Sequence, residues 1–221
     1  MTIEEYKGDS ARFSGCNPAM PNSMLVLAEV ERRTADEFSS AASYIERMAP
    51  YCNEGAIDAL SRAVCRLRNY ANAHRALLPP LSVDTLDLSL HIRRVCSALM
   101  GSSLADHGIT LSLYETPVTI EAGRAWRIGL ILSELISHAV VHDALPVAGG
   151  VIRVETTSDR FDIYVRVAGN GQGVKAFCGD TGTQIIDPPV EEMSGHIYRE
   201  THGDRATVLL TLPHTGIENR D

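Results

Sequence analysis

Three side chains with metal-binding chemistry recur at a four-residue spacing in the middle of the chain. Glu134, His138 and His142 follow one another at intervals of four, so on a helix they share one face. Two histidines one turn apart are a known arrangement for zinc, and one hypothesis is a transition-metal site at these residues. The sequence offers no evident further strong ligand. We therefore expect no metal here.

A second candidate site is the glycine-rich segment that runs from Gly169 through Gly171 to Gly173. The backbone N–H groups of such a segment can hold an anion, so a phosphate-binding loop is one interpretation. A glycine cluster after a strand is more often a simple turn without a ligand. We favour the turn and keep the anion site as the alternative.

The first part of the chain carries two helical patterns. Apolar residues recur at steps of three and four over about residues 24–49 and 57–78, and prolines end both stretches at Pro50 and at Pro79-Pro80. These stretches predict an antiparallel helical hairpin. A lone hairpin leaves apolar surface uncovered, so we expect a homodimer in which two hairpins form a four-helix bundle.

From residue 84 the pattern becomes mixed. Helical periodicity predicts helices over about 84–106, 123–143 and 182–194. Period-two alternation and short apolar runs predict strands at 109–113, 117–121, 150–157, 160–168, 196–201 and 206–213. The order indicates an α+β protein with an α/β sandwich, in which helices cover one face of a mixed sheet. We expect a polar arm at 1–22, the hairpin at 23–80 and the α/β domain at 81–214.

Composition excludes several classes of function. The formal net charge of −8 argues against nucleic-acid binding, which needs a basic surface. The chain has no apolar run long enough for a membrane helix and its polar N-terminus lacks a signal peptide, so we expect a cytoplasmic protein without a membrane partner. The five cysteines are scattered without a CxxC pair, which indicates reduced structural thiols.

The order of these elements, together with the stretch IGLILSELISHAVVHDAL at residues 128–145, resembles histidine kinases of the HWE-related group. The resemblance covers residues 24–213. It implies that the hairpin is a dimerisation and phosphotransfer domain and that the rest is an ATP-binding domain of the GHKL type. Glu134 matches the family's nucleotide-binding helix closely.

Other positions that hold nucleotide in that family are altered in this chain. The asparagine that holds magnesium corresponds to His138, although magnesium prefers oxygen ligands. The aspartate that contacts adenine corresponds to Gly169, which has no side chain. Asp180 replaces a glycine near the phosphate site, where negative charge repels a nucleotide. The resemblance implies a degenerate pocket, without ATP or magnesium, made of Glu134, His138, His142, Gly169, Gly171, Gly173 and Gly182.

The phosphoacceptor histidine of the family corresponds to Arg32, and no histidine precedes His74. Arginine does not give up its proton and is no phosphoacceptor. His74 is either a displaced acceptor or a packed residue of the helical bundle. Its position on the apolar stripe of the second helix favours packing.

These changes favour a non-catalytic adaptor of two-component signalling, a pseudo-histidine kinase. It would dock a response-regulator receiver domain or another histidine kinase. Arg32, Arg33 and Arg47 are candidate docking residues, with a solvated charged face as the alternative. Two other functions stay open: an active histidine kinase or phosphotransferase, the kinase using ATP and magnesium, and a module that binds a different ligand or metal in the vacated pocket.

Overall fold

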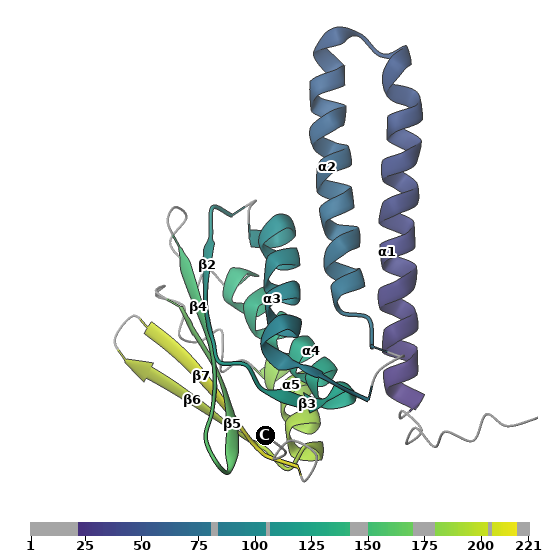
Figure 1. Ribbon diagram of the computed structural model, residues 1–221. Helices are drawn as coiled ribbons and strands as arrows, with labels where there is room; N and C mark the ends of the chain where they lie inside the picture. The colour runs from purple at the N-terminus through teal and green to yellow at the C-terminus, as the bar shows by residue number, and fades with distance from the viewer. Residues whose placement is uncertain are drawn as a thin grey trace, which may run out of the picture.

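The computed structural model describes residues 22–80, 84–104, 107–141, 150–169, 180–202 and 205–215. It consists of a helical hairpin and an α/β domain that meet at the base of the hairpin (Figure 1). The predicted arm lies outside these residues except for Asn22, which begins the first helix instead of ending the arm. His142, Gly171 and Gly173 also lie outside the described residues.

The hairpin is formed by α1 (Asn22–Met48), a short 3-10 turn (Ala49–Tyr51) and α2 (Glu54–Ala76). Asn53 caps α2, because its side-chain oxygen accepts a hydrogen bond of 2.9 Å from the backbone N–H of Ala56. Buried residues of the two helices include Ala35 and Ala42 on α1 and Val64 and Ala71 on α2. The aromatic ring of Phe38 on α1 also stacks on Tyr70 of α2, so small and aromatic side chains both contribute to the contact.

The main sheet has five strands in the order β2-β4-β5-β7-β6. The strands are β2 (Thr110–Glu115), β4 (Val151–Ser158), β5 (Asp162–Gly169), β6 (His196–His202) and β7 (Arg205–Pro213). β2 runs parallel to β4 and the other neighbours are antiparallel, which confirms the predicted mixed sheet. A separate two-stranded sheet pairs β1 (Thr85–Asp87) with β3 (Thr119–Glu121).

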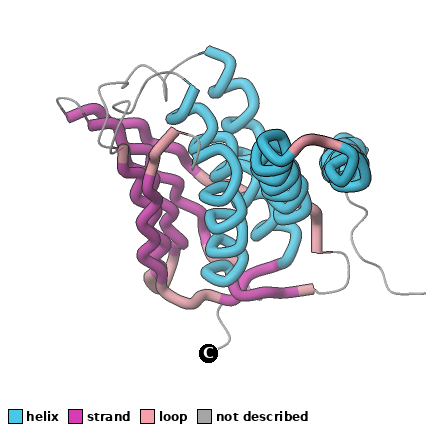
Figure 2. Tube along the Cα trace, turned by 90° about the horizontal axis from the view of Figure 1, so that it is seen from above, coloured by secondary structure: helices cyan, strands magenta, loops and turns pink. Residues whose placement is uncertain are grey.

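Three helices cover one face of the main sheet: α3 (Leu88–Leu99), α4 (Ala122–Val141) and α5 (Asp180–Glu192). Figure 2 shows the sheet, this helical layer and the hairpin as successive layers. The core between sheet and helices includes fully buried residues such as Ile92, Leu132, Ile163 and Leu210. The α+β sandwich with one covered face is therefore confirmed. Within the described ranges, no helix has both the length and the apolar character needed to cross a membrane.

The predicted start of the helix at residue 84 is wrong. Residues 85–87 form β1, and α3 begins only at Leu88. The Asp87 carboxylate accepts the backbone N–H of Ser89 at 2.8 Å, which caps the helix and separates it from the strand. Beyond α3 the chain continues in a π-helical turn (Met100–Leu104), so the single predicted helix is three elements.

A buried tryptophan fixes the hairpin to the α/β domain. Trp126 on α4 is only 1% exposed, and its indole N–H donates a hydrogen bond of 2.6 Å to the carbonyl oxygen of Leu77, immediately after α2. Further contacts join α2 to α3 and to the π-helical turn. The base of α2 is thus held against the helical layer.

Candidate functional site

Helix α4 brings together two residues of the predicted pocket. Oε1 of Glu134 lies 3.3 Å from Nε2 of His138, one turn along the helix. Their side chains are 34% and 15% exposed. No group of three or more histidine, cysteine, aspartate or glutamate residues suited to a metal occurs among the described residues. Because His142 lies outside them, the three-residue metal site is untested.

The glycines of the predicted pocket occupy different elements. Gly169 is the last residue of β5 and pairs with Ile152 on β4 and Ala206 on β7, so its backbone belongs to the middle of the sheet. Gly182 lies in the first turn of α5. The complete nucleotide pocket therefore stays a prediction.

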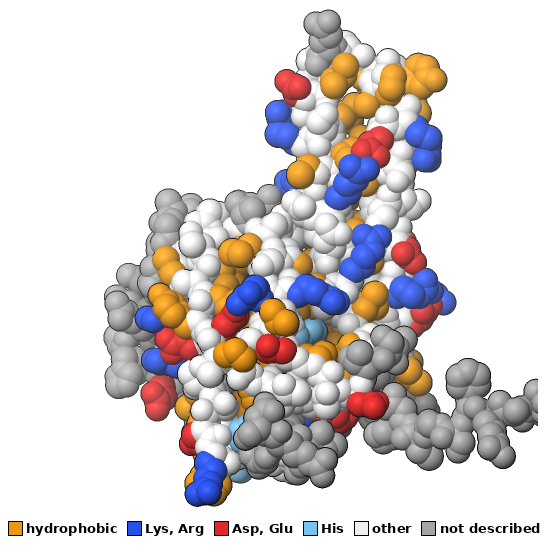
Figure 3. All heavy atoms as spheres, in the orientation of Figure 1, with side chains coloured by type: hydrophobic (Ala, Val, Ile, Leu, Met, Phe, Trp, Pro, Cys, Tyr) orange, Lys and Arg blue, Asp and Glu red, His pale blue; other side chains and the backbone are white. Residues whose placement is uncertain are grey.

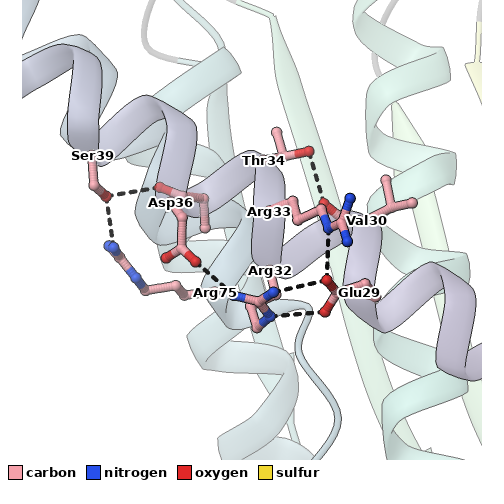
Figure 4. Close-up of polar contacts among 9 residues, drawn as sticks. Glu29, Val30, Arg32, Arg33, Thr34, Asp36, Ser39 and Arg75 are labelled. Atoms are coloured by element: carbon pink, nitrogen blue, oxygen red, sulfur yellow. Dashed lines mark hydrogen bonds and ion pairs between the residues drawn. The ribbon is translucent and has the colours of Figure 1, made fainter.

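At the position predicted to replace the phosphoacceptor, Arg32 is held by acidic neighbours on α1 (Figure 4). It donates to Glu29 at 2.8 and 2.9 Å and to Asp36 at 2.8 Å, while Arg33 donates to Glu29 at 2.6 Å. Hydrogen bonds from Arg32 and then Arg33 lower the pKa of Glu29 to about 2. The Glu29 carboxylate is therefore ionised at neutral pH and lies between the two guanidinium groups.

The three candidate docking arginines do not form one patch. Arg33 and Arg47 are 14 positions apart on α1, which is about 21 Å along a helix. Arg47 lies exposed in the last turn of α1, at the opposite end from the cluster of Glu29, Arg32, Arg33 and Asp36. Docking through these residues stays a prediction, and it would involve two separate places on the hairpin.

His74 has contacts inside the hairpin on two sides. Its Nδ1 lies 2.6 Å from Oε2 of Glu31 on α1, and its ring stacks on Phe38 with the ring centroids 5.7 Å apart. The side chains of His74 and Glu31 are 30% and 14% exposed. These contacts favour the interpretation of His74 as a packed bundle residue.

The side of α1 that faces α2 only partly coincides with the apolar stripe seen in the sequence. Leu27, Val30 and Met48 belong to the apolar residues that recur at steps of three and four on this helix, and they are 38%, 52% and 44% exposed. The side toward α2 shares Phe38 with this stripe, and it also includes Glu31 and the buried Ala35 and Ala42, at steps of four, three and four. A search for steps of three and four that also allowed polar residues would have identified Glu31.

A cavity of about 200 Å³ opens where the hairpin meets the α/β domain. It is bordered by α1, the end of α2, α4 and α5, through Leu27, Glu31, Leu77, Arg127, Leu130, Ile131, Ser133, Glu134, Ile186 and Pro189. Of the predicted pocket residues, Glu134 borders this cavity, whereas His138 and Gly169 do not. Sequence reasoning missed Arg127 because it has no counterpart in the motifs used.

No family model matches the chain. A sequence match exists to the blue-light-activated histidine kinase 2 of Erythrobacter litoralis, with 23% identity over 197 residues. The match covers 85% of this chain but only 56% of that protein. The chain is thus related in sequence to little more than half of a histidine kinase.

Solved structures support the fold. The histidine kinase domain of the Erythrobacter litoralis blue-light-activated kinase EL346 superposes with a TM-score of 0.55 and 19% identity, over 84% of this chain and 93% of that one. A structure described as a bacterial phosphotransferase gives a TM-score of 0.61 with 10% identity, over 86% and 97% of the two chains. The chain has a histidine-kinase-type fold, with the hairpin and the α/β domain both included in the similarity.

Proposed function

We propose that this protein is a histidine-kinase-like adaptor of two-component signalling that has lost ATP-dependent autophosphorylation. The sequence similarity to a histidine kinase supports two-component signalling at the level of the family. The state of Arg32 carries the proposal. Its guanidinium is permanently charged and is held by Glu29 and Asp36, so the position that aligns with the phosphoacceptor offers no nucleophile.

The adaptor acts as a dimer. Exposed apolar side chains on α1 and at the start of α2 include Leu27, Val30, Met48 and Ile57. Figure 3 shows hydrophobic side chains gathered at the end of the hairpin that is far from the α/β domain. Covering them with a second hairpin removes apolar surface from water, at about 25 cal/mol per Å². The resulting four-helix bundle presents the acidic and basic side chains of α1 to a receiver domain or another histidine kinase.

An incubation with radiolabelled ATP and magnesium tests the loss of autophosphorylation. We expect no phosphoprotein that is labile in acid and stable in base, with an active histidine kinase as the positive control. Such a phosphoprotein would contradict the proposal. A titration with a fluorescent ATP analogue tests the pocket separately, and micromolar affinity would contradict the loss of nucleotide binding.

A phosphotransferase is the second candidate, and His74 is the observation that favours it. With Nδ1 bound to the Glu31 carboxylate, His74 has a ring orientation in which Nε2 makes no hydrogen bond to any described residue. A histidine oriented by a carboxylate is a suitable nucleophile. Incubation with a phosphorylated receiver domain decides between the candidates. A phosphoryl group on His74, absent in His74→Gln, would establish phosphotransfer, and no transfer supports the adaptor.

A further inference from the structure

The cavity between the hairpin and the α/β domain has apolar walls. Leucine, isoleucine and proline side chains come from α1, α4, α5 and the end of α2: Leu27, Leu77, Leu130, Ile131, Ile186 and Pro189. Its volume of about 200 Å³ corresponds to roughly seven water molecules at about 30 Å³ each. A small organic molecule with a hydrocarbon body matches this size and lining.

Three charged residues border the cavity, and they differ in their partners. Glu31 is hydrogen-bonded to His74 at 2.6 Å, and Glu134 lies 3.3 Å from His138. Arg127, by contrast, makes no hydrogen bond or ion pair with any described residue, and its Nε is shielded from solvent without an acceptor. Arg127 borders the cavity, and its two Nη atoms, unlike Nε, are not buried, so the end of its guanidinium group has the capacity for one more partner.

We propose that this cavity binds a small monocarboxylate, with the carboxylate on Arg127 and the hydrocarbon body against the apolar wall. A guanidinium group pairs with a carboxylate through two parallel hydrogen bonds. The carboxylates of Glu31 and Glu134 on the same wall repel ligands with a higher negative charge, such as phosphate esters. Among anions, this charge arrangement favours a single negative charge on an apolar molecule over a higher one.

The location gives such a ligand a means of regulation. It would contact α1 and the end of α2 on one side and α4 and α5 on the other. The hydrogen bond from Trp126 to Leu77 lies at this junction, since Leu77 borders the cavity. A ligand that prefers one position of the hairpin relative to the α/β domain shifts the population toward it. This site is independent of the proposed adaptor role and would supply an adaptor with a chemical input.

The single tryptophan of the chain provides a local reporter. In the full-length protein, the NMR signal of the Trp126 indole N–H is followed during titration with octanoate, with octan-1-ol of the same chain length, and with inorganic phosphate. We expect a saturable shift of this signal with octanoate and a matching rise in melting temperature. Octan-1-ol and phosphate should give neither. An equal response to octan-1-ol or to phosphate would overturn carboxylate recognition, and no saturable response to octanoate would overturn the site.

Two variants test whether octanoate binds in this cavity. Arg127→Gln should weaken octanoate binding at least about tenfold, which is about 1.4 kcal/mol, whereas the control Arg160→Gln on the exposed β4–β5 turn should bind like the original protein. Ser133→Leu places a larger side chain at the cavity wall and should also abolish binding, with Arg127 retained. Unchanged affinity in folded Arg127→Gln would overturn the proposal. If Arg127→Gln fails to fold, unchanged octanoate affinity in Ser133→Leu would overturn the proposal.

Discussion

Oε2 of Glu31 lies 2.6 Å from Nδ1 of His74, so the two helices of the hairpin are joined through a carboxylate and an imidazole near its base. Glu31 is only 14% exposed, and a carboxyl group in such a place needs a hydrogen-bond partner. The pair explains why a histidine occupies the interior of the hairpin. It also makes the stability of the hairpin depend on both residues.

Removing the imidazole should therefore destabilise the protein. We expect His74→Leu to lower the free energy of unfolding by about 1–3 kcal/mol, because the Glu31 carboxylate loses its hydrogen-bond partner. Adding Glu31→Gln to this variant should lower the free energy of unfolding only a little further. Urea denaturation of the two single variants and the double variant measures the coupling between the residues. A coupling energy below about 0.5 kcal/mol, the range for independent sites, would contradict the pairing.

The stability of the α/β domain should depend on His91 at mildly acidic pH. Burial, followed by the nearby positive charge of Arg94, lowers the pKa of His91 to about 4. The unfolded chain, with an ordinary histidine pKa near 6.5, binds the proton more readily between these two values. Stability is therefore fully present above pH 6.5 and falls as the pH drops toward 4, by roughly 3 kcal/mol at most at 1.36 kcal/mol per pKa unit.

His91→Gln removes the titrating group and should flatten this part of the pH profile. The measurement is the urea midpoint of both proteins at several pH values between about 7 and about 4. This window includes the folded and the unfolded pKa of His91. His196→Gln, an exposed position on β6, is the matched control and should keep the slope of the original protein. A slope that survives in His91→Gln would show that another group is responsible.

Gly129 should tolerate alanine only when His91 is removed. A Cβ at Gly129 would lie 2.5 Å from Nε2 of His91 and 3.5 Å from Cγ2 of Val95. Alanine is the better helix former by about 1 kcal/mol, but overpacking of a core costs about 1–3 kcal/mol. We expect Gly129→Ala to destabilise the original protein and to stabilise His91→Ala. Thermal unfolding of the original protein, the two single variants and the double variant measures the effect of Gly129→Ala in both backgrounds. A change of melting temperature in the same direction in both would refute this prediction.

Most elements could be predicted from the sequence because their periodicity is strong and their ends carry local signals. The two hairpin helices end near Pro50 and Pro79, and the alternation of Ile152 and Val154 identifies β4 correctly. β1 was missed since three residues show no period, and its pairing with β3 depends on a segment more than 30 positions away. Local pattern carries no information about such a partner.

The candidate site was predictable only in part, for a similar reason. The spacing of Glu134 and His138 gives their shared helix face, and the structure places them 3.3 Å apart. The partnership of Glu31 with His74 spans 43 positions, and the exposure of Arg127 to a cavity depends on where α1 and α5 pack. These relationships arise from tertiary packing, which a motif of consecutive residues does not encode.

The exposed apolar side chains of the hairpin should act in dimer formation. Val30 on α1 is 52% exposed and belongs to the stripe that α2 leaves uncovered. Val30→Glu would place a charge in the proposed interface, where burial of a valine contributes about 1.5–3 kcal/mol. We expect the dimer dissociation constant to rise by at least about tenfold, measured by sedimentation equilibrium. Phe161→Glu, at a 71% exposed position of the α/β domain, should leave it unchanged. If the original protein sediments as a monomer at all concentrations, the four-helix bundle is wrong, and the stripe needs a different partner.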